Sequence, residues 1–240
     1  MSLFLPFLLY AAVVVFALGM AWRLSTWKRA PVPLKIVLTP GPATGGGVVR
    51  RLAGELFLFR SLFGADRGLW VAAWLFHLSL ALLAVGHLGG LVTPGLAKAC
   101  LGLTEEQFHS LAQVAGGTFG VMALIPLLYL LSRRFSHERT RYISTFSDYF
   151  ALVLLGLVLA TGNHMRFLGG LESAQAREFV SGWFNLQPVA PPTVPAFKLH
   201  VVLVCALLVY IPFSKLVHLG GLAFNPTLNQ KNNPREERFA

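Results

Sequence analysis

The fold is decided by the stretch Leu69-Trp-Val-Ala-Ala-Trp-Leu-Phe-His77-Leu-Ser-Leu-Ala-Leu-Leu-Ala-Val-Gly-His87-Leu-Gly-Gly-Leu91. It is long and apolar enough to cross a bilayer as an α-helix, which needs about 20 apolar residues. Its two histidines, His77 and His87, are separated by about 15 Å along such a helix. A polar ring inside hydrocarbon is costly, so a histidine within a membrane span predicts a functional site.

The composition is typical of a membrane protein, because 55% of the 240 residues are hydrophobic and 12% are charged. The segments between the apolar stretches are too short for an independent soluble domain. We therefore predict an all-α integral membrane bundle that forms a single domain over residues 1–240. No Lys or Arg precedes the first stretch, so we expect it to remain as a helix and not to be cleaved as a signal peptide. The five predicted transmembrane helices lie at roughly 3–22, 69–92, 108–131, 147–164 and 197–217.

Basic residues are divided unequally between the two ends of these helices. Sixteen of the 20 Lys and Arg residues fall on one side, and the positive-inside rule places that side in the cytoplasm. We expect a multi-pass protein of the bacterial or archaeal cytoplasmic membrane, with its N-terminus outside and its C-terminus in the cytoplasm. The net charge of +10 thus indicates topology and not nucleic-acid binding. The sixteen residues are Arg23, Lys28, Arg29, Lys35, Arg50, Arg51, Arg60, Arg67, Arg133, Arg134, Arg139, Arg141, Lys215, Lys231, Arg235 and Arg238.

Two further patterns each have two interpretations. The cytoplasmic segment at about residues 50–66 has apolar residues at helical spacing with arginines between them, which predicts an amphipathic helix. It would lie either on anionic lipid headgroups or under a cytoplasmic partner. Gly116 and Gly120 form a G-x-x-x-G pair, which favours either close helix packing or contact with a flat haem.

Four histidines in two helices form the candidate cofactor site. Helices two and five run antiparallel in this topology, so His77 and His218 fall in the inner half and His87 and His200 in the outer half. Neutral imidazole is a common axial ligand of haem, and a bundle core is a usual place for a cofactor. Each leaflet therefore offers one histidine from each helix, which predicts two haem b groups. Eighteen residues of continuous helix make five turns, so His200 and His218 would face the same direction.

Other chemistries fit the four histidines less well. Zinc needs its ligands to converge at one point, whereas these lie in two leaflets. A proton relay is the stronger alternative, although no Asp or Glu accompanies the histidines in helices two and five. The two cysteines, Cys100 and Cys205, lie in different segments and outside any C-x-x-C-H motif, which excludes covalent c-type haem.

Several residues at the membrane faces are secondary candidates. Basic side chains there would either pair with haem propionates or extend toward water as ordinary residues of helix ends. These candidates are Lys198, Lys215, Arg133 and Arg166. His109 and His164 are candidates for an outer quinone pocket, the alternative being interfacial loop histidines without a ligand.

Several motifs resemble the gamma subunit of respiratory nitrate reductase over about residues 69–220. The resemblance implies a di-haem b-type cytochrome that exchanges electrons with quinone (menaquinone or ubiquinone), with His77 paired with His218 and His87 with His200. The nitrate reductase subunit has a lysine at the start of its third helix, where this chain has Phe108 and His109. The motifs are Phe76-His77-x9-His87 followed by Gly89 to Pro94, Ala115-Gly-Gly-x-x-Gly120, Arg133-Arg134-Phe135, Lys198-Leu-His200 and Pro212-Phe-Ser-Lys-Leu-x-His218.

Two other segments, Glu55 to Trp70 and Phe224-Asn-Pro226, resemble more closely the cytochrome b subunit (DsrM) of the membrane complex linked to dissimilatory sulfite reductase. That family implies a cytoplasmic iron–sulfur partner resembling heterodisulfide reductase, together with other membrane and periplasmic subunits. Electrons would pass between the quinone pool and a sulfur-carrier disulfide or trisulfide, so the chain itself would carry out at most quinol oxidation or quinone reduction. The alternatives are the gamma subunit of a nitrate reductase and a haem-free membrane anchor or proton-conducting subunit.

Overall fold

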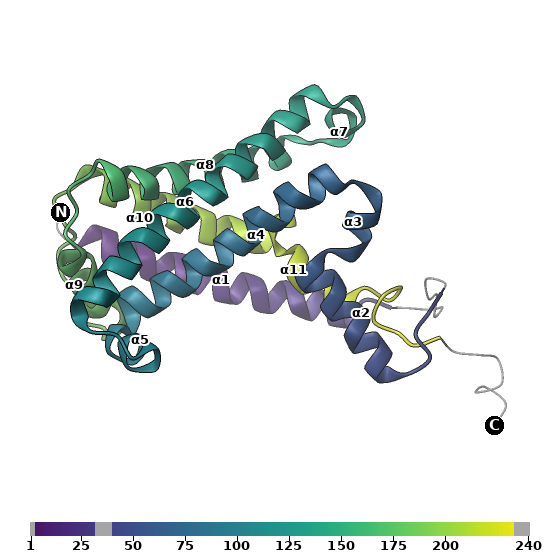
Figure 1. Cartoon of the computed structure of the whole chain (residues 1–240), viewed down its shortest axis with the longest axis horizontal. Coiled ribbons are helices and arrows are strands. Elements are labelled where there is room, and N and C mark those ends of the chain that lie inside the picture. The colour runs from purple at the N-terminus through teal and green to yellow at the C-terminus, as the bar shows by residue number, and fades with distance from the viewer. Residues whose placement is uncertain (1–2, 32–39, 233–240) are drawn as a thin grey trace. The chain divides into compact units, whose positions relative to one another are not determined.

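The computed structural model describes residues 3–31 and 40–232, and the secondary structure of these residues is helical (Figure 1). Three basic residues of the topology argument, Lys35, Arg235 and Arg238, lie outside the described residues. Five helices are long and apolar enough to span a membrane, which confirms the predicted all-α membrane fold. They are α1 (Phe4–Arg29), α4 (Arg67–His87), α6 (Glu105–Ser136), α8 (Phe146–Phe167) and the helix Pro195–Phe213 that begins with α10 (Pro195–Tyr210).

The chain forms two compact units, which are described separately. The first unit comprises Met1–Val15 and Val71–Tyr210, and the second comprises Phe16–Trp70 and Ile211–Ala240. Only 17% to 28% of the most apolar window of each spanning helix is buried inside the protein. Most of the apolar surface is therefore left for lipid, as expected of a multi-pass membrane protein.

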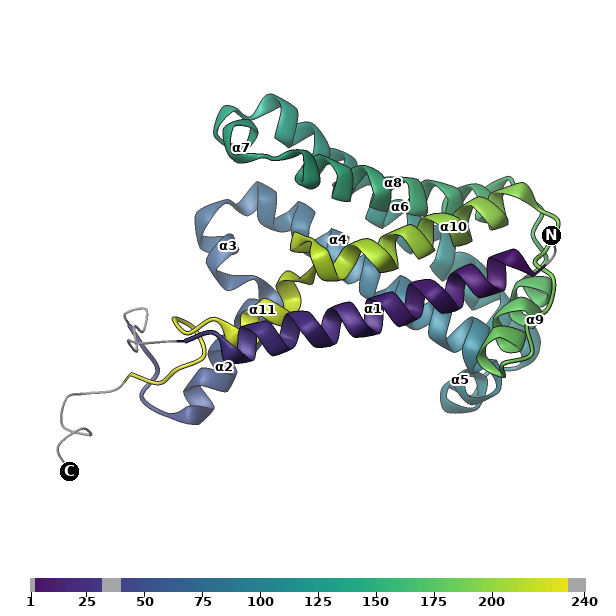
Figure 2. The same cartoon turned by 180° about the vertical axis from the view of Figure 1, so that it is seen from behind.

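In the first unit, α8 lies beside both α6 and α10 (Figures 1 and 2). Glycines of α6 allow this close approach, because Gly120 lies directly against the Asn163 side chain of α8. A cluster of buried side chains joins α4 to the same helices: Phe76 from α4, Ala123 and Leu127 from α6, and Leu159 from α8. Close helix packing at the Gly116–Gly120 pair, one of the two interpretations of that motif, is thus confirmed.

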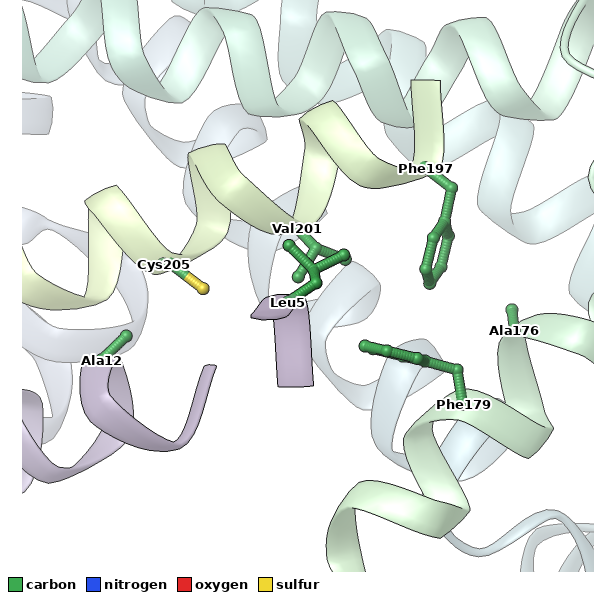
Figure 3. Close-up of a cluster of buried hydrophobic side chains, with 7 residues drawn as sticks. All are labelled: Leu5, Ala12, Ala176, Phe179, Phe197, Val201 and Cys205. Carbon is green, nitrogen blue, oxygen red and sulfur yellow. The ribbon is translucent and has the colours of Figure 1, made fainter. Parts of the chain in front are cut away.

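A second buried cluster of the first unit joins α1 and α10 to α9 (Ser173–Phe184), a short helix between α8 and α10 (Figure 3). The rings of Phe179 and Phe197 meet edge to face, with their centroids 5.3 Å apart. Tyr10 of α1 stacks on Trp183 of α9 and donates a hydrogen bond to its carbonyl oxygen at 2.6 Å. The buried members are Leu5, Ala12, Ala176, Phe179, Phe197, Val201 and Cys205.

Two short helices and a π-helical turn complete the first unit. The π turn Leu88–Val92 follows α4 directly, and α5 (Pro94–Leu101) begins with a proline at its first helical position. Between α6 and α8 lies α7 (Glu138–Ile143). Thr145 and Asp148 form a capping box at the start of α8, in which the Asp148 carboxylate accepts from the Thr145 N–H at 2.9 Å. This capping box fixes the beginning of the fourth span.

In the second unit the predicted amphipathic segment is divided into α2 (Gly45–Leu58) and α3 (Arg60–Ala65). Phe59 separates them with a left-handed backbone (φ 48°), and its N–H donates to the Gly54 carbonyl oxygen. Glu55 stabilises the corner by accepting a hydrogen bond from the Ser61 hydroxyl at 2.6 Å. The segment therefore bends at Phe59, whereas the pattern of apolar residues predicts one continuous helix.

The last predicted span also differs from the structure. The α-helix ends at Tyr210 and is followed by the 3₁₀ turns Ile211–Phe213 and Lys215–Val217, before α11 (His218–Phe224) begins. Pro212 has no N–H to continue the helical bonding, and the extended Ser214 caps the next turn by accepting from the Leu216 N–H at 3.1 Å. His200 and His218 therefore do not lie on one continuous helix, and the prediction that five helical turns relate them is wrong.

Candidate functional site

The outer histidine pair lies in the first unit. His87 is the last residue of α4, and its Nδ1 is 2.7 Å from the Leu83 carbonyl oxygen. His200 lies near the start of α10 and is partly buried, and its Nδ1 is 2.9 Å from the Thr161 hydroxyl of α8. Both histidines predicted to ligate the outer haem therefore belong to the first unit, and their pairing stays a prediction.

The Thr161 hydroxyl is part of a short chain of hydrogen bonds. Its Oγ1 donates toward the carbonyl oxygens of Leu157 at 2.8 Å and Val158 at 3.0 Å, both on the preceding turn of α8. While its one proton is donated to these carbonyl oxygens, this oxygen can accept a hydrogen bond from the tautomer of His200 that carries its proton on Nδ1. The lone pair of the His200 ring then lies on Nε2, which is the nitrogen that can ligate a metal.

The inner candidates have the same ring chemistry. The Nδ1 of His77 in the first unit is 2.7 Å from the Ala73 carbonyl oxygen, and the Nδ1 of His218 in the second unit is 3.0 Å from the Lys215 carbonyl oxygen. A backbone acceptor at Nδ1 places the lone pair on Nε2 in each ring. All four histidines thus fit the donor set that haem requires, while the pairing of His77 with His218 stays a prediction.

The other outer candidates gather at one end of the first unit. Because α8 runs antiparallel to α6 and α10, the start of α6, the end of α8 and the start of α10 lie at the same end (Figure 2). The exposed residues His109, His164 and Lys198 lie there. Arg166 lies there too, with its guanidinium over Gly116, so that an added glycine Cβ would be 2.8 Å from Nη2. Their contacts with propionates or quinone stay predictions.

The inner basic candidates have different surroundings. Arg133 lies in the last turns of α6 and donates from Nη1 to the Thr140 hydroxyl of α7 at 3.1 Å. Lys215 is exposed in the second unit, and its carbonyl oxygen is the acceptor near His218. Arg133 therefore helps to hold the loop between α6 and α8, a role that the sequence does not reveal.

Comparison with known proteins identifies the chain's relatives. The family described as nitrate reductase gamma subunit matches residues 59–228, a range that contains all four candidate histidines. The chain belongs to the nitrate reductase gamma subunit family. This confirms the resemblance inferred from the motifs.

The chain is similar to relatives of two kinds, Hdr-like menaquinol oxidoreductase subunits and nitrate reductase gamma chains. The Hdr-like menaquinol oxidoreductase cytochrome b-like subunit of Archaeoglobus fulgidus is 31% identical over 95% of this chain and 80% of its own length. The nitrate reductase gamma chain of Bacillus subtilis is 32% identical over 62% of this chain and 70% of its own length. The respiratory nitrate reductase 1 gamma chain of Escherichia coli is 31% identical over 65% of this chain and 73% of its own length.

Proposed function

We propose that this protein is the di-haem b-type cytochrome subunit of a respiratory membrane complex. It would transfer electrons between quinone at the outer face and an iron–sulfur partner at the cytoplasmic face. The observation that carries the proposal is the hydrogen bonding of the four histidines, since each engages Nδ1 and so presents Nε2 as the ligand nitrogen. A haem held by two such histidines accepts and releases single electrons.

The residues of the first unit have distinct proposed roles at the outer site. His87 and His200 would hold the outer haem through their Nε2 atoms, one from α4 and one from α10. Lys198 and Arg166 are positively charged at the same end of the unit and would pair with propionates there. At the inner site, His77 and His218 would be the ligands, with Arg133 and Lys215 as the corresponding cations.

Quinone exchange is proposed for the outer end. His109 and His164 are both exposed, on the first turns of α6 and the last turn of α8. A neutral imidazole can accept a hydrogen bond from a quinol hydroxyl and pass the proton of that hydroxyl to the outside. The Archaeoglobus relatives are named menaquinol oxidoreductase subunits, which supports a quinol of this type as the substrate.

The partner is proposed from the relatives' names and from the extent of each match. The Hdr-like relatives match 95% and 98% of this chain, whereas the Bacillus nitrate reductase chain matches 62%. The longer match favours a cytoplasmic iron–sulfur subunit resembling heterodisulfide reductase, in dissimilatory sulfur metabolism and with other membrane and periplasmic subunits. A nitrate reductase partner is the alternative, and co-purification from the native membrane distinguishes the two.

We also propose that the N-terminus lies outside and the C-terminus in the cytoplasm.

The first test is a reduced-minus-oxidised visible spectrum of the purified protein, with haem quantified per chain. We expect two b-type haems, and we expect His87→Ala or His200→Ala to remove one of them. His137→Ala is the matched control, because His137 is exposed and lies in the loop after α6, and it should keep both haems. A folded, colourless wild-type protein would refute the proposal and favour the haem-free anchor or proton-conducting alternative.

A further inference from the structure

We propose that Thr161 of α8 is a positioning residue for His200, and that it adjusts the properties of one haem independently of the other. The inference rests on the proposed function, because it takes His200 to be an axial ligand. Thr161 does not contact the iron in this account. It acts only through the imidazole, by fixing which ring nitrogen carries the proton and where the ring points.

The direction of the hydrogen bonds determines the state of the ring. Thr161 donates its single hydroxyl proton into the carbonyl oxygens of its own helix, at 2.8 Å and 3.0 Å. Its oxygen, 2.9 Å from Nδ1 of His200, then acts as an acceptor and favours the tautomer of His200 that carries its proton on Nδ1. If Thr161 lost its acceptor oxygen, the tautomer with the proton on Nε2 would no longer be disfavoured, and that tautomer cannot ligate a metal through Nε2.

The acceptor at His200 differs in kind from those at the other candidate ligands. His77, His87 and His218 direct Nδ1 to a main-chain carbonyl three or four residues earlier. His200 has its Nδ1 next to the Thr161 side-chain hydroxyl and also meets a backbone acceptor at Val158, both on a different helix, so a shift of α8 along α10 changes these contacts directly. A hydroxyl is also a weaker acceptor than a carbonyl, so it makes the ring less electron-donating toward a metal.

The contact between Thr161 and His200 lies within the packed interface between α8 and α10. A Cβ added at Gly162, the next residue, would lie 3.5 Å from Cε1 of His200, so the imidazole rests against the α8 backbone. At the other end of the same two helices, the Tyr210 hydroxyl donates to the Ser147 carbonyl oxygen at 2.9 Å. These two bonds link α10 to α8 near both ends, which holds His200 in register with Thr161.

The test compares three variants of the full-length protein by redox titration and by electron paramagnetic resonance of the oxidised haems. Thr161→Val keeps the shape but removes the acceptor, whereas Thr161→Ser keeps the acceptor. Thr118→Val is the matched control, because Thr118 is an exposed threonine of α6. We expect Thr161→Val to shift one haem's midpoint potential upward and change its low-spin signal, with about 10- to 100-fold weaker haem retention at that site. The other haem should be unchanged.

Each outcome distinguishes the two proposals. Wild-type protein without haem would refute the proposed function itself. Two haems in the wild type, with an unaltered potential and signal in Thr161→Val, would refute only the role of Thr161. Loss of the signal in Thr161→Val with recovery in Thr161→Ser supports the role, even if the valine variant retains less haem. Loss in both the valine and the serine variants would show a general packing role and would also overturn the inference.

Discussion

Replacing Gly120 by alanine tests how α6 and α8 fit together, and thereby how α8 is held in place to contact His200. A methyl group at this position would collide with the Asn163 amide, whose Cγ would lie 3.1 Å from the new Cβ. Asn163 is not free to turn away without loss, because its Nδ2 donates to the Leu159 carbonyl oxygen at 2.9 Å. The Gly120 variant should therefore be less stable than the wild type.

The magnitude follows from three contributions. Breaking the Asn163 hydrogen bond costs about 0.5–1.5 kcal/mol, and the remaining overpacking costs roughly 1–3 kcal/mol. Alanine is better than glycine inside a helix by about 1 kcal/mol, which offsets part of this. We expect a net loss of about 1–3 kcal/mol in the free energy of unfolding. Gly116→Ala meets the end of the flexible, exposed Arg166 side chain, so it should be neutral or stabilising by up to about 1 kcal/mol.

The assay is unfolding of the purified protein in detergent, with haem release followed in parallel. Gly120→Ala and Gly116→Ala are compared in one background, and Gly120→Ala/Asn163→Ala tests the cause. If the clash is with the Asn163 amide, the double variant should recover at least about 1 kcal/mol beyond the sum of the single effects. Equal stability of the two alanine variants, or additive effects in the double variant, would refute this reasoning.

Three further changes have expected outcomes in the same unfolding assay. Gly19→Ala places a Cβ 2.8 Å from Cβ of the rigid Pro212 ring and should destabilise by about 1–2 kcal/mol; an unchanged midpoint would contradict that contact. Tyr10→Phe removes the bond to the Trp183 carbonyl oxygen and keeps the stacked ring, so we expect a loss of about 1 kcal/mol, and no loss would count against that bond. The Ser79 hydroxyl is buried without a hydrogen-bond partner among the described residues, so Ser79→Ala should be neutral or stabilising by about 1 kcal/mol. A marked loss of stability there would indicate a partner for the hydroxyl.

Hydropathy predicts the spans well but not their interruptions. Each of the five predicted spans overlaps an observed helix, because 18 or more apolar residues have few other ways to satisfy their backbone in lipid. Hydropathy does not predict the end of the helix at Tyr210, since Ile211 and Phe213 are as apolar as the rest of the span, although Pro212 between them indicates a distortion. The left-handed Phe59 is also invisible in the sequence, because glycine or asparagine would normally mark such a turn.

The candidate site was predicted in part for a similar reason. Histidine is rare within apolar stretches, so His87 and His200 are conspicuous in the sequence, and both lie in the first unit. Thr161 is not conspicuous, because threonine commonly satisfies its hydroxyl within its own helix. The available signal was the polar run from Thr161 to His164 at the end of an apolar span. Which of these residues meets His200 depends on the rotation of α8, which the sequence alone does not define.

The interruption of the helix between Tyr210 and His218 affects how a protein of this kind can evolve. His200 belongs to the first unit and is fixed by α8, whereas His218 belongs to the second unit, where Gly19 and Trp27 of α1 lie against Pro212 and Gly220. In an unbroken helix, an insertion or a rotation near one histidine would also displace the other. With the interruption at Pro212, an insertion or a rotation on one side is not carried through a continuous helix to the other side.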